Sequence, residues 1–184
     1  DALPISVMFI LLFVDGLQLN IVIAFLIGIS GVTLMGLIDD ILSLSAKRRL
    51  VILFILALIV LVGCLQFYFP ERLLHTSLPL TLLTSFVVVF WIVSITNAIN
   101  LSDGLDGLAS CLSLVSVAAF AVIFYLQGRT QLALPTTLAL FGAIAGFLPY
   151  NISPARIFMG DAGSMFIGFM LGILSIMSMS QKSL

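Results

Sequence analysis

Five of the chain's eight acidic residues lie in three short polar breaks between long apolar stretches. The first break is the pair Asp39 and Asp40, the second covers residues 97–107, and the third covers residues 154–161. In a membrane protein, the number of spans between two loops decides whether the loops share a side. Because two spans are expected between each successive pair of breaks, all three should meet at one membrane face. The sequence therefore predicts a carboxylate-rich site there.

The second break places oxygen-bearing side chains at every third position. On a helix, this spacing keeps the side chains on one slowly winding stripe. Asn and Asp also cap helices, and the glycines at 104 and 107 break them, so a structural role is the alternative. Four such side chains in ten residues exceed what capping needs, and we therefore favour a functional role for Asn97, Asn100, Asp103 and Asp106.

The first break also admits two interpretations. Asp39 and Asp40 are either a solvated loop at the end of a span or a site for a hard cation or a basic partner such as Lys47. Repulsion between adjacent carboxylates could also raise the pKa of one of them and create a proton acceptor. Both interpretations place the pair at the water interface.

The third break reads as a loop that enters a helix near Asp161. The N-terminus of that helix offers N–H groups that could bind phosphate oxygens, and Asp161 is alternatively only its N-cap. Arg156 is either a phosphate partner or a positively charged anchor on the cytoplasmic side. Phe158 is either an interface anchor or a platform on which a flat ring stacks.

The composition indicates a membrane protein. Of 184 residues, 62% are hydrophobic and 8% charged, with a mean hydropathy of +1.33, whereas soluble domains carry about 25% charged residues. Seven basic and eight acidic residues nearly balance, which argues against a nucleic-acid partner. Cys64 and Cys111 lie in apolar stretches and His75 is the only histidine, so we expect neither a disulfide framework nor a histidine-based metal site.

Segments of about 20 apolar residues can cross the bilayer core, and they predict an all-α, polytopic fold with six to seven transmembrane helices. Residues 2–14 form a span that is short or cut off. Without a repeat or a soluble domain, residues 1–184 are expected to be one integral-membrane domain. The six convincing spans cover residues 21–38, 50–69, 80–95, 105–126, 132–148 and 163–179.

Basic residues indicate the orientation of these spans. Lys47, Arg48, Arg49 and Arg156 are predicted on the side of the acidic breaks, whereas Arg72, Arg129 and Lys182 are predicted on the other. The cluster of three next to Asp40 favours the cytoplasm for the acidic face.

An oxygen-rich, cysteine-free site with basic residues nearby predicts a Mg²⁺ centre, with Mn²⁺ as an alternative. Magnesium with carboxylates and cations suits phosphoryl chemistry, because the metal neutralises phosphate charge. The residues therefore point to a membrane enzyme that acts on a phosphate-containing substrate. An ion or proton transporter would instead place its carboxylates near the bilayer midplane. A purely structural membrane subunit would not need three motifs on one face.

Three ordered runs, GLIDD (followed by SAK), NAINLSDGLDGLA and PARIFMGDAGS, resemble the polyprenyl-phosphate N-acetylhexosamine-1-phosphate transferases. The resemblance covers residues 31–172. It implies a multi-pass enzyme of the bacterial cytoplasmic (inner) membrane, with a cytoplasmic active site. Such enzymes use Mg²⁺ to transfer a sugar 1-phosphate from a UDP-sugar to undecaprenyl phosphate, release UMP and initiate synthesis of cell-envelope polymers. The third run is closer to the WecA and TagO branch than to MraY, which favours UDP-N-acetylglucosamine over UDP-N-acetylmuramoyl-pentapeptide.

The resemblance also implies roles for the residues that match its motifs. The groups assigned to the lipid phosphate and to catalysis are Asp39, Asp40, Lys47 and Asp103. The metal-binding groups are Asn100, Asp103 and Asp161, and the groups near the nucleotide are Gly104, Asp106, Asn151 and Phe158, with Phe158 stacked on the uracil. Apart from the resemblance, Asn97 and Arg156 are predicted from their chemistry to contact phosphate or another polar group at the site. An oxygen of the lipid phosphate would attack the β-phosphorus, directly or after a covalent Asp intermediate.

The family also carries N-terminal spans with a Pro- and Gly-rich motif, and a downstream cytoplasmic loop rich in His and basic residues. Neither is complete in residues 1–184, so we expect the chain to be a fragment without some residues that help to select the sugar. The expected partners are the UDP-sugar, undecaprenyl phosphate and membrane lipids. Assembly as a homodimer is an open alternative.

Overall fold

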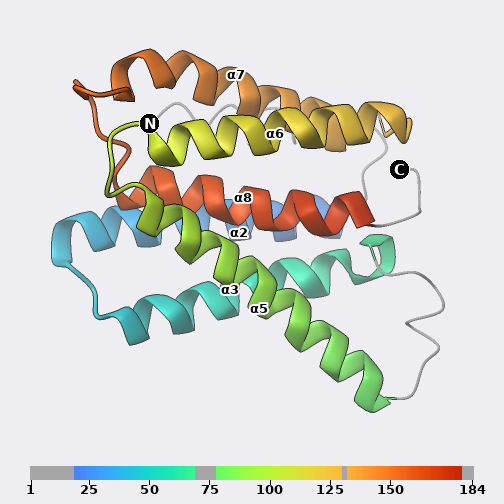
Figure 1. Ribbon diagram of the computed structural model, residues 1–184. Helices are drawn as coiled ribbons and strands as arrows, with labels where there is room; N and C mark the ends of the chain where they lie inside the picture. The colour runs from blue at the N-terminus through green and yellow to red at the C-terminus, as the bar shows by residue number, and fades with distance from the viewer. Residues whose placement is uncertain (1–18, 69–77, 130–131, 180–184) are drawn as a thin grey trace.

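The computed structural model describes residues 19–68, 78–129 and 132–179, and every regular element in these ranges is an α-helix (Figure 1). The predicted partial span at residues 2–14 and the side chains of Cys64 and His75 lie outside the described part. The six helices are α2 (Leu19–Leu42), α3 (Ala46–Tyr68), α5 (Leu78–Ser102), α6 (Leu108–Leu126), α7 (Ala133–Asn151) and α8 (Gly160–Met179).

Five of these helices are long and apolar enough to cross a membrane, which confirms the prediction of an all-α polytopic protein. The helix not counted among them, α3, has three basic residues in its first turns, and its sequence is apolar from Leu50 to Leu65. It packs on α2 and α5.

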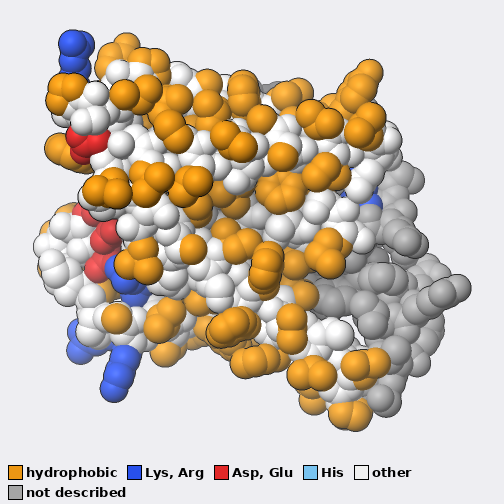
Figure 2. All heavy atoms as spheres, in the orientation of Figure 1, with side chains coloured by type: hydrophobic (Ala, Val, Ile, Leu, Met, Phe, Trp, Pro, Cys, Tyr) orange, Lys and Arg blue, Asp and Glu red, His pale blue; other side chains and the backbone are white. Residues whose placement is uncertain are grey.

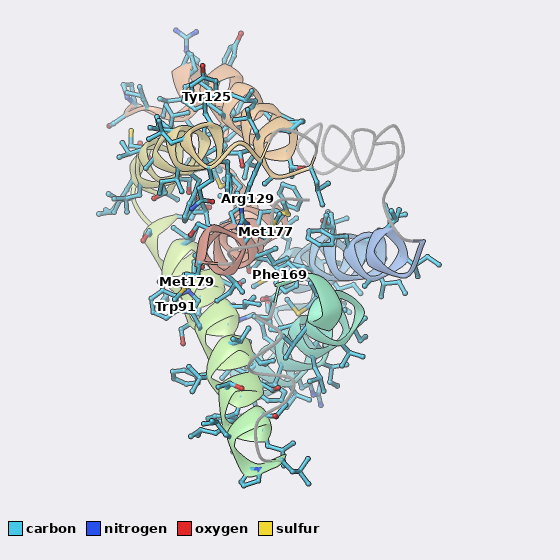
Figure 3. All side chains as sticks on the ribbon, turned by 90° about the vertical axis from the view of Figure 1, so that its right-hand side faces the viewer. Trp91, Tyr125, Arg129, Phe169, Met177 and Met179 are labelled. Carbon is cyan, nitrogen blue, oxygen red and sulfur yellow. The ribbon has the colours of Figure 1, made fainter. Side chains whose placement is uncertain are left out.

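Helix α8 forms the centre of the bundle, with α2, α5 and α6 packed around it (Figures 1 and 3). Nearly every residue from Ala162 to Leu174 is buried. Glycines allow the close approach of its neighbours: a Cβ at Gly168 would lie 2.7 Å from Cα of Thr96, and one at Gly172 would lie 3.0 Å from Cα of Ile92. Small residues at such contacts are typical of helix packing within membranes.

Three helices extend further into the polar breaks than the apolar stretches predicted. Helix α5 continues to Ser102, and the Asn97 side chain within it bonds back to the helix, with Nδ2 donating to the Val93 carbonyl at 2.8 Å. Helix α7 passes through Pro149 to Asn151, and the Ile152 N–H still reaches the Leu148 carbonyl. Helix α8 begins at Gly160 rather than at 163. The first break and the start of the second therefore belong to helix ends, whereas residues 103–107 form a turn and residues 152–159 form the loop between α7 and α8.

At the end of the bundle opposite the acidic residues, Arg129 caps α8 (Figure 3). Its guanidinium donates to the Met177 carbonyl, and Gln127 Nε2 donates to the Ser178 carbonyl at 3.0 Å. Arg129 is 3% exposed. A buried cation at this position satisfies carbonyl groups that have no partner within the helix and complements the negative end of the helix dipole.

We expect Arg129→Leu to lower the free energy of unfolding by about 2 kcal/mol, because it leaves buried carbonyl groups without a donor. Thermal melting of the full-length protein in detergent measures the effect. Tyr125→Leu is the matched control. Tyr125 lies in the last turn of α6, four residues before Arg129, and is 70% exposed. Equal melting temperatures for Arg129→Leu and the wild type would contradict the capping role.

Candidate active site

All five acidic residues in the described part gather at one end of the bundle, together with four of its five basic residues (Figure 2). They come from the C-terminus of α2, the turn between α5 and α6, and the start of α8. This arrangement confirms the prediction that two helices separate each pair of breaks and bring all three to one face. Arg129 lies at the other end, as predicted.

The N-terminus of α8 is held by the carboxylate of Asp40. Its Oδ1 accepts the N–H of Asp161 at 2.9 Å, and its Oδ2 accepts the N–H of Ala162 at 3.2 Å. The prediction that these N–H groups are free for phosphate oxygens is therefore wrong for this structure. A helix N-terminus attracts negative charge, and the nearest anion is a side chain of the protein itself.

Asp39 has other hydrogen-bond partners than Asp40, although the two residues are adjacent in sequence. Its Oδ2 forms a 3.0 Å ion pair with Nη1 of Arg49, and its Oδ1 accepts the Leu44 N–H at 2.7 Å. Successive residues on a helix point to different neighbours, so the two carboxylates have different hydrogen-bond partners, although both lie close enough to Asp161 for their charges to act on it. The predicted basic partner, Lys47, is exposed, and Arg49 takes that position instead.

Asn100 connects the second break to the third. Its Nδ2 donates to Oδ1 of Asp161 at 2.7 Å and to Oγ of Ser164 at 2.9 Å. Ser164 is fully buried and donates in turn to the Gly160 carbonyl at 2.9 Å. Ser164 was not predicted as a site residue, although its position three residues after Asp161 in the run GDAGS places both on one face of α8.

The predicted stripe of four polar side chains ends with Asn100. Helix α5 stops at Ser102, and Asp103 and Asp106 lie in the turn that follows, where Gly107 has a φ of +73°. Asn97 does not join the acidic residues, because its amide is bonded to its own helix. The structure therefore places Asn100 beside an acidic residue of the third break, whereas the prediction that all four side chains share one helical face is wrong.

Asp103 lies in the most unusual electrostatic environment of the site. Burial raises the pKa of its carboxyl from 3.8 to about 6, and the negative charges of Asp161 and Asp40 act in the same direction. A hydrogen bond from the Gly160 backbone opposes them. The negative charges of Asp161 and Asp40 near the Asp103 carboxyl favour a cation at this position.

The donor set fits Mg²⁺ in its chemistry. Mg²⁺ is usually held by one or two carboxylates together with substrate phosphates and water, and Asp103 and Asp161 supply two carboxylates, with Asn100 beside them. Within the described ranges, no three His, Cys, Asp or Glu side chains lie close enough to hold a metal by themselves. The site therefore suits a metal whose coordination is completed by a substrate.

The loop between α7 and α8 is fastened to the turn after α5. Oδ2 of Asp106 accepts the Ala155 N–H at 3.1 Å, and Asn151 accepts from Oγ of Ser110 at 2.6 Å and donates to the Ile157 carbonyl at 3.1 Å. Asn151 is 2% exposed, so the expected contact of its amide with uracil is not available in this structure. Its hydrogen-bonding groups are used by the protein, as buried amides require.

Phe158 projects from the same loop and is 72% exposed, which leaves its ring accessible for stacking. Arg156 and Gly104 are also exposed at this end of the molecule. Contacts of these three residues with a nucleotide or phosphate remain predictions.

Comparison of the sequence with known proteins identifies its family. Residues 22–179 match the family model described as glycosyl transferase family 4. The chain therefore belongs to this family of membrane-embedded transferases.

Two curated relatives narrow the comparison. A probable undecaprenyl-phosphate N-acetylglucosaminyl 1-phosphate transferase of Bacillus subtilis is 40% identical over 157 residues, which are 85% of this chain and 44% of the relative. A phospho-N-acetylmuramoyl-pentapeptide-transferase of Staphylococcus aureus is 33% identical over 198 residues, covering 100% of this chain and 61% of the relative. The chain thus spans about half the length of these relatives.

Proposed function

We propose that the chain is the catalytic core of an enzyme that transfers N-acetylglucosamine 1-phosphate from UDP-N-acetylglucosamine to undecaprenyl phosphate. The observation that carries the proposal is the set of hydrogen bonds that joins Asp40, Asn100 and Asp161 from three separate breaks. The name of the Bacillus relative supports both the sugar and the lipid.

The residues divide into a donor side and an acceptor side. Asp103 and Asp161 with Asn100 would hold Mg²⁺, which when bound neutralises the diphosphate and stabilises the leaving UMP. The exposed ring of Phe158 would stack on the uracil. Lys47 would hold the phosphate of the acceptor lipid, and Asp40 fixes the position of Asp161.

The reaction is an exchange of one phosphorus–oxygen bond for another. A phosphate oxygen of the acceptor forms a bond to the β-phosphorus of the UDP-sugar, and the bond from that phosphorus to the bridging oxygen breaks. UMP leaves with the α-phosphate. The product is a lipid-linked sugar diphosphate that would initiate synthesis of a cell-envelope polysaccharide.

We place this face of the protein in the cytoplasm of a bacterium, because four described basic residues accompany the acidic ones there. A transporter is not favoured. Its carboxylates would lie near the middle of the spans, whereas those of this chain lie at helix ends on one face (Figure 2). A muramoyl-pentapeptide donor is the second candidate, and the Staphylococcus relative supports it.

The test follows UMP release by the full-length protein in detergent, with undecaprenyl phosphate, Mg²⁺ and UDP-N-acetylglucosamine. We expect release that depends on the lipid, and we expect Asp161→Asn to reduce it at least about a hundredfold. An unchanged melting temperature for the variant would show that it is folded. Release from the muramoyl-pentapeptide nucleotide alone would establish the second candidate, and release from neither nucleotide would overturn the proposal.

A further inference from the structure

The ring of Phe158 is 72% exposed, so its direction depends mainly on the backbone of the loop between α7 and α8. The residue before it, Ile157, is fixed at both of its peptide groups. The Ile157 N–H donates to the Tyr150 carbonyl at 3.1 Å, and the Ile157 carbonyl accepts from Nδ2 of Asn151 at 3.1 Å. Because a peptide unit is planar, the second bond also fixes the N–H end of the peptide that leads into Phe158.

Asn151 is held in turn by a residue of another helix. Ser110, in the first turn of α6, donates its hydroxyl proton to Oδ1 of Asn151 at 2.6 Å. Since Oδ1 is the acceptor in this bond, the Nδ2 donor of the same amide is directed to the Ile157 carbonyl. Ser110 is 0% exposed and Asn151 2%, so water cannot replace the hydroxyl. Two hydrogen bonds therefore connect α6 to the backbone next to Phe158.

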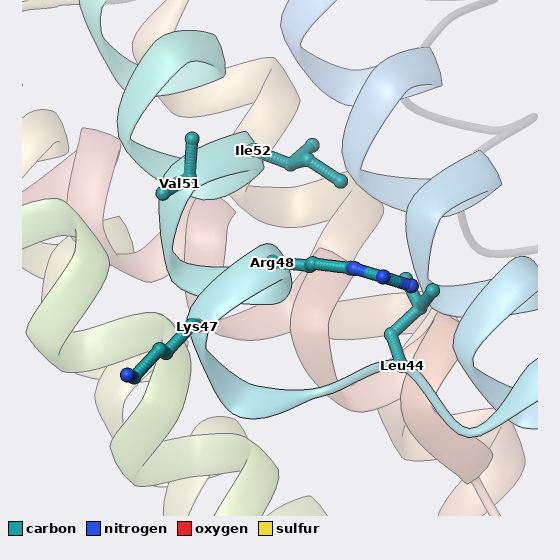
Figure 4. Close-up of a pocket in the computed structure, with 5 residues that line it drawn as sticks. All are labelled: Leu44, Lys47, Arg48, Val51 and Ile52. Atoms are coloured by element: carbon teal, nitrogen blue, oxygen red, sulfur yellow. The ribbon is translucent and has the colours of Figure 1, made fainter.

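A shallow groove at the start of α3 offers a base no comparable platform (Figure 4). None of its lining residues is aromatic; they are Leu44, Lys47, Arg48, Val51 and Ile52. The two basic side chains extend to opposite sides of the helix, so they do not converge on one ligand (Figure 4). A flat ring therefore finds a stacking partner at Phe158 and not in this groove.

We propose that Ser110 is a positioning residue for the nucleotide, which acts through Asn151 to hold Phe158 where its ring stacks on the uracil. This role rests on the proposed function, in which Phe158 contacts the base. Without the Ser110 hydroxyl, the buried Oδ1 of Asn151 has no donor, and the amide holds the Ile157 carbonyl less firmly. The base then binds more weakly. Because the uracil is remote from the reacting phosphorus, the loss should affect nucleotide affinity and not the rate of the chemical step.

The test measures the binding of UMP to the full-length protein in detergent with Mg²⁺, by isothermal titration calorimetry. We expect Ser110→Ala to bind UMP about fivefold more weakly than the wild type, as for the loss of one hydrogen bond. The KM for UDP-N-acetylglucosamine should rise by a similar factor, with kcat changed less than about twofold. Ser113→Ala is the matched control and should bind UMP like the wild type. Ser113 lies on the same face of α6 and is fully buried, but its hydroxyl has no hydrogen-bond partner among the residues that the structure describes.

A double-mutant cycle separates positioning of the ring from a general structural effect. In a Phe158→Leu background the ring is absent, so Ser110→Ala should weaken UMP binding no further. The same loss with and without the ring would overturn the role of Ser110, as would equal UMP affinities of Ser110→Ala and the wild type or of Ser110→Ala and Ser113→Ala. UMP binding needs no transfer reaction. Failure of the wild type to release UMP would therefore overturn the proposed function, whereas the binding measurements alone decide on Ser110.

Discussion

We expect Gly36→Ala to reduce UMP release at least about a hundredfold, although the substitution adds one methyl group. A Cβ at Gly36 would lie 2.4 Å from Cα of Ala162, 2.7 Å from its nitrogen and 2.8 Å from the Asp161 carbonyl oxygen. All three atoms are backbone, so no side-chain rotation relieves the clash. Helix α8 must move away from α2 at the residue that carries the Asp161 carboxylate, and a displacement of about 1 Å at a reacting centre can cost a hundredfold in rate.

The measurement is UMP release by the full-length protein, with thermal melting as a check on folding. Gly146→Ala is the matched control, because a Cβ at that position of α7 would meet no atom within 4 Å. We expect this control to retain its activity. Full activity of Gly36→Ala would show that the contact between α2 and α8 does not position Asp161.

The meeting of the three breaks could be predicted from the sequence, because it depends only on the number of spans between them. Apolar length identifies a span reliably, and two spans return the chain to the same face. The proximity of Asp40, Asn100 and Asp161 follows from that count and from the concentration of polar side chains. Both predictions can be made without knowing the direction in which any side chain points.

The directions of individual side chains could not be predicted. Asp39 and Asp40 are equivalent as sequence, yet one pairs with Arg49 and the other caps α8, since adjacent helical positions point to different neighbours. Asn151 likewise matches a motif of the family, but it is buried and hydrogen-bonded to Ser110 and Ile157. These outcomes depend on which helices pack together.

The role of Gly36 also needed the structure. Its place in the run GLIDD, three residues before Asp39, marks the motif but gives no sign that the helix backbones of α2 and α8 touch at this point. Close approach is a property of two helices together, and apolar periodicity within one helix cannot indicate its partner.

We expect Asp103→Asn to abolish most UMP release and, at the same time, to raise the thermal stability of the metal-free protein at pH 7. The folded protein holds the Asp103 proton more tightly than an unfolded chain does, since its pKa is about 6 instead of 3.8. Stability is therefore greatest when the carboxyl is protonated and falls as the pH rises through this interval. Asparagine cannot ionise, so the variant does not lose this stability as the pH rises. An acidic group kept in an unfavourable position is typical of a site where activity is retained at the cost of stability.

The measurement is the melting temperature of the wild type and of Asp103→Asn as a function of pH, in a metal chelator and in Mg²⁺. In the chelator, the variant should melt above the wild type at pH 7, and the two curves should converge as the pH falls from about 6 to 3.8. Mg²⁺ should raise the melting temperature of the wild type more than that of the variant, because a cation relieves the repulsion among Asp103, Asp161 and Asp40. Parallel melting curves at all pH values would contradict the raised pKa. Equal stabilisation of both proteins by Mg²⁺ would exclude Asp103 from the metal site, even if the pH dependence were as expected.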